Sequence, residues 1–167
     1  LTNTGDLTLT SVTTGGNASF STNGDLTLGG GAIGGNAAFT ATNGDVVMTS
    51  APTITGDLSL TTVASGDVIV PNAGLSVGGN LTVDADDLRD SDGGELTLAA
   101  NNADITLRVG APDRNWSTTF NDLVLSLTGT GDFSLNNTGA LALSLTTTGG
   151  TASFTSNGDL TLNAGTI

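Results

Sequence analysis

The chain has 167 residues and a formal net charge of −13, with 16 acidic residues, three arginines and no lysine, histidine or cysteine. Without histidine and cysteine there is no imidazole base, no thiol nucleophile and no usual zinc or haem ligand, which argues against hydrolase, redox and transition-metal functions. An acidic chain with no basic patch is expected to bind neither nucleic acid nor an anionic membrane, and no apolar run is long enough for membrane insertion.

A pentad of the type Gly-Asp-Leu-Thr-Leu recurs along the chain in two alternating families. In the first family an acid precedes the apolar pair in all but one copy, and strands are predicted at 7–9, 26–28, 46–48, 68–70, 96–98, 123–125, 141–143 and 160–162. The second family begins with Asn, Asp or Thr, and its strands are predicted at 18–20, 37–39, 58–60, 81–83, 105–107, 133–135 and 152–154. Apolar residues two positions apart share one face of a strand, and the preceding Gly and Asx residues favour turns.

Strict alternation of the two families at a period of about 19 or 20 residues is typical of a stacked-coil solenoid. No helical period interrupts it, so we predict an all-β fold, a right-handed parallel β-helix (β-solenoid) of roughly eight coils, as a single domain over residues 1–167. A third, weaker strand is expected to cover Val12, Ile33, Val63 and Leu145, with its register left open.

Stacking should place equivalent apolar residues over one another in two interior rows. The first row is predicted to hold Leu7, Leu26, Val46, Val68, Leu96, Leu123, Leu141 and Leu160. The second row is predicted to hold Phe20, Phe39, Leu60, Val83, Leu107, Leu135 and Phe154.

The pentads at 5–9, 24–28 and 158–162, with the Gly-Gly-Asn-Ala-Ser-Phe segment at 15–20, resemble the repeat region of filamentous-haemagglutinin-like exoproteins of two-partner secretion. The likeness covers almost the whole chain and implies a right-handed parallel β-helix with a coil of this size. The secretion domain of that family carries Asn-Pro-Asn-Leu and Asn-Pro-Asn-Gly motifs, and neither occurs in this sequence. The resemblance therefore implies part of the shaft rather than the export module.

The acids that open the first-family pentads should lie at one corner of the rod. Neighbouring carboxylates would then be roughly 5 Å apart and repel by about 1 kcal/mol per pair. Each carboxylate could accept hydrogen bonds from the backbone of its own turn, which the Asn17, Asn36 and Asn80 of the second corner favour. Ca²⁺, which prefers oxygen ligands, could instead bridge the carboxylates of some successive coils. No cofactor is predicted to be required, and Ca²⁺ is a candidate ligand for these side chains.

The coils at 66–93 and 94–121 are longer than the others by about eight or nine residues, which predicts adjacent side excursions from the rod at 84–93 and 108–119. The first excursion holds the candidate Ca²⁺ ligands Asp84, Asp86, Asp87, Asp90 and Asp92. Solenoid insertions commonly carry binding residues, so Arg108, Arg114 and Trp116 are candidate partner-binding residues. The alternative is local: the arginines pair with the neighbouring acids, and the tryptophan covers the edge of the core.

These features favour a non-catalytic extracellular shaft of a bacterial surface adhesin or biofilm-matrix protein that mediates cell-surface or cell–cell attachment. The expected partner is a cell-surface or matrix polysaccharide or protein. The alternative is a self-assembling filament subunit, because the coils at 5–23 and 139–157 are closely similar and neither end has a charged cap. A pectate-lyase-like enzyme would share the architecture, but the scarcity of cationic side chains argues against it, and no enzymatic activity is predicted.

Overall fold

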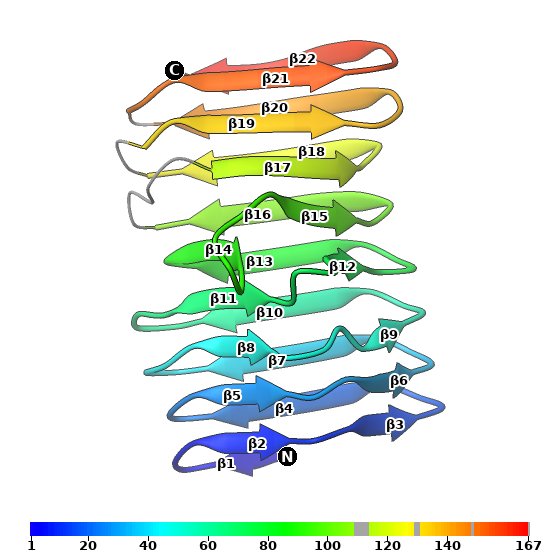
Figure 1. Ribbon diagram of the computed structural model, residues 1–167, viewed down its shortest axis with the longest axis vertical. Coiled ribbons are helices and arrows are strands. Elements are labelled where there is room, and N and C mark those ends of the chain that lie inside the picture. Colours follow the sequence, from blue (N-terminus) through cyan, green and yellow to red (C-terminus); the bar gives the residue numbers. More distant parts are fainter. Residues whose placement is uncertain (109–113, 129–130, 148, 167) are drawn as a thin grey trace.

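The computed structural model describes residues 1–108, 114–128, 131–147 and 149–166. Every regular element in these residues is a strand, and the strands stack in parallel sheets (Figure 1). Figure 1 shows the front strands running from left to right and the back strands from right to left while the chain climbs from the N-terminus to the C-terminus. This winding is right-handed, and the prediction of an all-β solenoid of about eight coils is confirmed. No helix among the described residues could span a membrane.

One wall of the rod, which we call the back sheet, continues through every coil. Its register is regular, with Ala18 beside Ala37 and Leu58 beside Leu81, for example. Its nine strands, in spatial order, are β1 (Thr2–Asn3), β4 (Ala18–Thr22), β7 (Ala37–Ala41), β10 (Leu58–Thr62), β13 (Leu81–Ala85), β16 (Asn102–Leu107), β18 (Asp122–Leu127), β20 (Leu141–Thr147) and β22 (Leu160–Thr166).

The opposite wall changes halfway along the rod. In the lower coils it consists of two sheets that meet at an angle. The lower front sheet contains β2 (Leu7–Leu9), β5 (Leu26–Leu28), β8 (Val46–Met48), β11 (Asp67–Val70) and β14 (Asp87–Asp90). The side sheet contains β3 (Val12–Thr14), β6 (Gly31–Ile33) and β9 (Thr53–Ile54).

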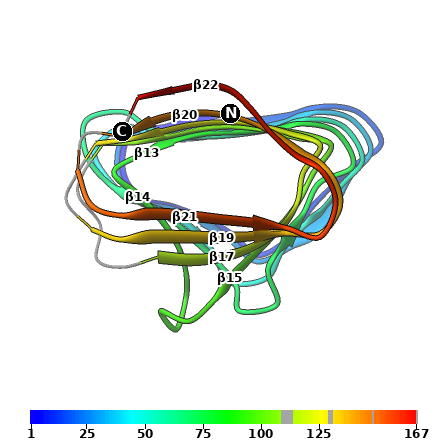
Figure 2. The ribbon, with the colours of Figure 1, turned by 90° about the horizontal axis from the view of Figure 1, so that it is seen from above.

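In the upper coils a single sheet, the upper front sheet, replaces both of these. Its strands are β12 (Leu75–Ser76), β15 (Leu96–Ala99), β17 (Arg114–Thr119), β19 (Phe133–Asn137) and β21 (Ala152–Ser156). Seen along the axis in Figure 2, β17, β19 and β21 run alongside the back strands on the other side of the coil, so the upper coils are two-sided and the lower ones three-sided.

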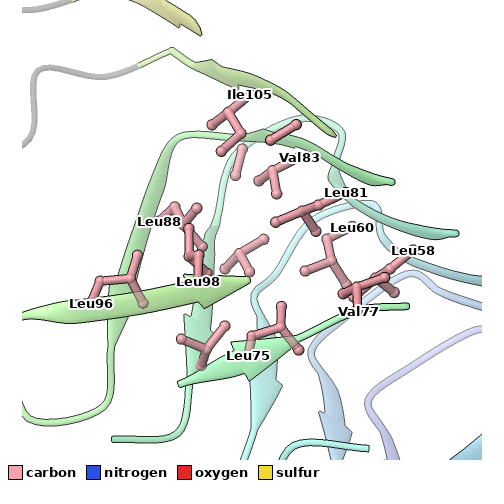
Figure 3. Packing of buried hydrophobic residues seen from close by; sticks show 14 of the residues in the cluster. Leu58, Leu60, Leu75, Val77, Leu81, Val83, Leu88, Leu96, Leu98 and Ile105 are labelled. Atoms are coloured by element: carbon pink, nitrogen blue, oxygen red, sulfur yellow. The ribbon is translucent and has the colours of Figure 1, made fainter. Parts of the chain in front are cut away.

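The core lies between these walls and follows from the two-residue alternation of the strands. Inward side chains stack on like side chains, as the rings of Phe20 and Phe39 do at 6.0 Å with an angle of 15° between them. At the level of the change in the front wall, Leu88 of β14 and Leu98 of β15 both point into the core that Val83 of β13 lines from the back (Figure 3). Both front sheets therefore bury their apolar residues in one continuous core.

The predicted interior rows are correct in the first four coils. Above them the order is wrong, although Leu141 and Leu160, and Leu135 and Phe154, are neighbours as predicted. Val68 lies beside Leu88 rather than Leu96, and Leu96 pairs with Trp116 in the upper front sheet. The later members Leu123, Leu141 and Leu160 belong to the back sheet. In the second row Val83 is followed by Ile105 instead of Leu107, while Leu135 and Phe154 pair with each other in the upper front sheet.

The side excursions predicted at 84–93 and 108–119 are wrong for most of their length. Residues 84–85 end β13 and 87–90 form β14, so of this predicted excursion only the loop after β14 projects from the rod (Figure 2). Residues 114–119 form β17, and residues 109–113 lie outside the described part of the chain. The extra residues of these two coils therefore form regular strands. The coil length itself stays nearly constant, because residues paired in adjacent coils are 19 positions apart from Ala18 to Ala37 and 20 apart from Leu123 to Leu143.

The third strand is confirmed only in the lower coils. Val12 and Ile33 lie in the side sheet, where Val12 pairs with Gly31 and Thr14 pairs with Ile33. Val63 follows β10 outside any strand with 56% of its surface exposed, and Leu145 belongs to the back sheet.

The alternation in β15 gives a direct test of the strand faces. Leu98 is 1% exposed, whereas Thr97 faces solvent. Leu98→Asp is expected to lower the free energy of unfolding by several kcal/mol, because it buries a carboxylate without a partner, while Thr97→Asp should cost little. Urea unfolding of the two variants measures this, and equal losses would contradict the assigned faces.

Candidate functional site

The corner residues form two hydrogen-bonded columns along the rod. In the first column the backbone N–H of Asp25 donates to Asp6 Oδ1 at 3.0 Å, that of Asp45 donates to Asp25 Oδ1 at 2.9 Å, and that of Asp67 donates to Asp45 Oδ1 at 2.8 Å. Each side chain therefore accepts a bond from the next coil. The prediction that it would bond to its own turn is wrong in this respect.

The second column works in the same way with amides as well as carboxylates. Asn36 N–H donates to Asn17 Oδ1 at 2.9 Å, Asp57 N–H to Asn36 Oδ1 at 3.0 Å, and Asn80 N–H to Asp57 Oδ1 at 2.9 Å. Backbone N–H groups at a turn lack a sheet partner, and an Asx oxygen supplies it. Asn and Asp offer the same acceptor, so the bond explains the repeat without requiring the charge.

Arg108 joins three successive coils in the middle of the rod. It follows β16, and its Nε donates to Asp86 Oδ1 at 3.1 Å, while Nη1 bonds to Asp84 in the coil below. Its Nη2 reaches one coil further, to the carbonyl oxygen of Thr62 and, at 3.0 Å, to the hydroxyl of the same residue. Its five donors suit such a multiple contact, which a lysine could not make.

Arg114 joins the two front sheets. It opens β17 of the upper front sheet, and its guanidinium bonds to both carboxylate oxygens of Asp87 in β14, with Nε 3.0 Å from Oδ1. Asp87 is 8% exposed, so this bidentate pair replaces water at a nearly buried carboxylate.

Arg89 donates to Asp67 Oδ2 at 3.3 Å. Burial raises the pKa of Asp67, although the bond from Arg89 opposes this shift.

Trp116 is a core residue, which contradicts its prediction as a contact for a partner. It faces inward from β17, is 1% exposed, and packs edge to face on Phe133 with ring centroids 4.9 Å apart. Its Nε1 finds no acceptor in the part of the chain that the structure describes. The three candidate partner-binding residues do not form an exposed patch, because Trp116 is buried and both Arg108 and Arg114 are bonded to acids.

The five candidate Ca²⁺ ligands divide into two groups. Asp84, Asp86 and Asp87 are bonded to arginines. Asp90 and Asp92 flank the turn after β14 and lie close together. Burial first, and the neighbouring Asp92 next, raise the pKa of Asp90. In the described parts of the chain no three acidic side chains converge on one point.

Two residues that matter for the geometry gave no signal in the sequence. The buried amide of Asn137 accepts from the Thr118 hydroxyl and from the backbone N–H of Phe120, both at 2.9 Å, and donates to the Phe120 carbonyl at 3.1 Å. Asn72, in the loop after β11, donates to Asp92 Oδ2 at 2.5 Å. Neither belongs to a pentad, and each meets its partner only through stacking.

Two shallow grooves run beside the second Asx column on the outer face of the back sheet. One, of about 330 Å³, includes Asn36, Asp57 and Ser59 in its lining, and the other, of about 280 Å³, includes Asn102 and Asp104. Their polar lining consists of amides, hydroxyls and carboxylates. Such a lining can hydrogen-bond to an extended polar chain, with negative charge that disfavours a polyanion.

No protein-family model, curated protein or solved structure matches the chain. Its function is therefore argued from its own residues.

The Asx columns predict a specific response to substitution. Asp25→Ala removes the acceptor for Asp45 N–H and is expected to lower the free energy of unfolding by about 1 kcal/mol. Asp25→Asn keeps an acceptor oxygen and should change stability little. Thermal unfolding in EDTA measures both variants. If the Asn variant lost as much as the Ala variant, the charge rather than the bond would explain the repeat.

Proposed function

We propose that the chain is a non-catalytic extracellular shaft of a bacterial surface adhesin or biofilm-matrix protein, in which it mediates cell-surface or cell–cell attachment. The observation that carries the proposal is the back sheet, whose nine parallel strands follow one another along the axis with one register shift, at Leu143 and Ser144 in the last pair. A rod whose coils are all joined by backbone hydrogen bonds resists bending and extension, and each added coil adds about 4.8 Å of length.

The distribution of side chains supports the same role. Most of the large apolar residues lie in the core, while the outward positions of the back sheet carry mostly small polar groups, such as Ser21, Thr40 and Thr61 in one row. A hydroxyl-covered surface stays hydrated and resists non-specific association. The amide, hydroxyl and carboxylate groups in the mainly apolar lining of the grooves favour a matrix polysaccharide of low negative charge as the partner. The lack of cysteine suits a chain that crosses membranes unfolded on its way out of the cell.

A spacer experiment tests the shaft. The full chain is placed between an outer-membrane anchor and a binding domain of known ligand on a non-adherent bacterium. Capture of ligand-coated beads is expected to rise relative to the anchor and binding domain alone, and to rise again with two chains in tandem, because a stiff rod extends the reach of the binding domain. The matched control carries Leu98→Asp, which should abolish the gain. An equal gain with this variant would show that any linker suffices and would contradict the shaft.

A filament subunit is the second candidate, because the outer end of the last coil is apolar. No described residue covers it: Leu160 and Leu162 of β22 are 45% and 60% exposed. A hollow of about 190 Å³ opens there, lined by Leu143, Leu145 and Phe154 among others. The first coil of a second copy would bury these residues and pair with the open strand edges.

Sedimentation velocity over a range of concentrations separates this candidate from the shaft alone. A filament subunit is expected to form longer species as concentration rises, and Leu162→Asp should prevent this by placing a charge in the joint. Thr161→Asp, an outward change in the same strand, is the control and should leave assembly intact. A wild-type chain that stays monomeric at every concentration would contradict the filament.

A further inference from the structure

Asp90 occupies a position at which an ionised side chain is costly. It pairs with Val70 in the register of the lower front sheet, and below Val70 the same inward row continues through Met48 and Leu28. Asp90 thus ends an apolar row and is only 4% exposed. No donor among the described residues reaches its Oδ1. A buried carboxylate in this state requires a neutralising group nearby.

A second carboxylate lies against it. A Cβ built on Gly94 would lie 3.1 Å from Asp92 Oδ1 and 3.3 Å from Asp90 Oδ2, so both side chains converge on the same glycine. Asp92 is held in place by the Gly94 N–H at 3.1 Å and by the Asn72 amide at 2.5 Å. The Ser91 hydroxyl in turn bonds to Asn72 Oδ1. Gly94 and Asn72, the latter supported by Ser91, therefore hold the Asp92 carboxylate beside that of Asp90.

The chain has no cationic side chain left for this pair. The sequence contains no lysine or histidine and only three arginines. Arg89 is bonded to Asp67, Arg108 to Asp84 and Asp86, and Arg114 to Asp87. The two carboxylates must therefore share a proton or bind an external cation.

We propose that Asp90 and Asp92 bind a Ca²⁺ ion at the turn between the lower and upper front sheets. The donors are all oxygen atoms, which a hard cation prefers, and Asp92 is exposed, so an ion can enter from solvent. With two carboxylates rather than three, water completes the coordination, and the dissociation constant falls on the order of 10⁻⁴–10⁻³ M, as in extracellular modules. Bound Ca²⁺ would fix the point at which the chain leaves one sheet for the other.

The experiment compares melting of the full chain at pH 7.5 in 10 mM CaCl₂ and in NaCl of the same ionic strength. Ca²⁺ is expected to raise the midpoint by about 3–10 °C beyond NaCl, because it binds only the folded state. Asp92→Asn should remove this difference. Asp159→Asn, an exposed acid in the last coil, changes the net charge equally and should retain it. Equilibrium dialysis with ⁴⁵Ca²⁺ should then count one ion per chain in the wild type and the Asp159 variant, and none in the Asp92 variant.

Each remaining outcome overturns the proposal. Coincident midpoints in the two salts for the wild type would mean that screening alone acts on the acids. A Ca²⁺ effect that survives in the Asp92 variant would place the ion elsewhere. A wild type that is stabilised by lowering the pH to 5 in EGTA and ignores Ca²⁺ would mean that the pair shares a proton instead. Because Asp92 is exposed, its Asn variant is expected to fold, and the dialysis result does not depend on stability.

Discussion

Hydrogen bonding between consecutive coils is the interaction on which the rest of the rod depends. In the sheets, backbone N–H and carbonyl groups of parallel strands pair from one coil to the next. At the corners, Asx side-chain oxygens accept hydrogen bonds from the N–H groups that have no sheet partner, as Asp25 does from Asp45. This pairing fixes the register, and the register in turn places each apolar side chain on one of its kind. The core, the polar surface and the stiffness of the rod are consequences of that repetition.

Because pairing with the neighbouring coil fixes the place of each strand, similar sequences can lie in different sheets. Residues 18–22 and 152–156 both begin Ala-Ser-Phe and follow a Gly-Gly pair two positions earlier, yet the first segment lies in the back sheet and the second in the upper front sheet. A pentad specifies a short strand with one apolar face, and either wall satisfies that requirement. The coil beneath a strand, rather than its own sequence, decides which wall it joins.

The change of wall is concentrated at the arginine contacts. β14 ends the lower front sheet and β17 continues the upper one, and the bidentate Arg114–Asp87 pair connects them. Arg108 fixes the neighbouring corner to the two coils below. All the cationic side chains of the chain are used here, where the regular repetition is interrupted and backbone pairing alone does not determine the path. Most of the acids near this change of wall are bonded to these arginines.

The sequence predicted the solenoid and the strands that contain a pentad, with their inward faces, because a two-residue alternation is a local property that survives in any stacking order. It did not predict β14 and β17 as strands. It did not predict the stacking order above Val68. Strand β14 contributes a single inward leucine, Leu88, followed by the buried acid Asp90, and it therefore looked like a polar excursion. Likewise β17 has no pentad, so the sequence left Trp116 either as a partner-binding candidate or as a cover for the edge of the core, whereas it lies in an inward row. Contacts such as Asn72 with Asp92 depend on that order and could not be derived from spacing.

Engineered disulfides test the stacking order most directly, since the chain has no cysteine of its own. Thr106 and Ser126 are neighbours in the back sheet, whereas the simple alternation of pentads would place Thr97 beside Val124. Adjacent parallel strands bring Cα atoms to about 4.8 Å, within the range that a disulfide spans. Under mild oxidation the Thr106→Cys, Ser126→Cys variant should cross-link as a folded monomer, and the Thr97→Cys, Val124→Cys variant should not. The reverse result would contradict the change of wall and restore one uninterrupted row of first-family strands.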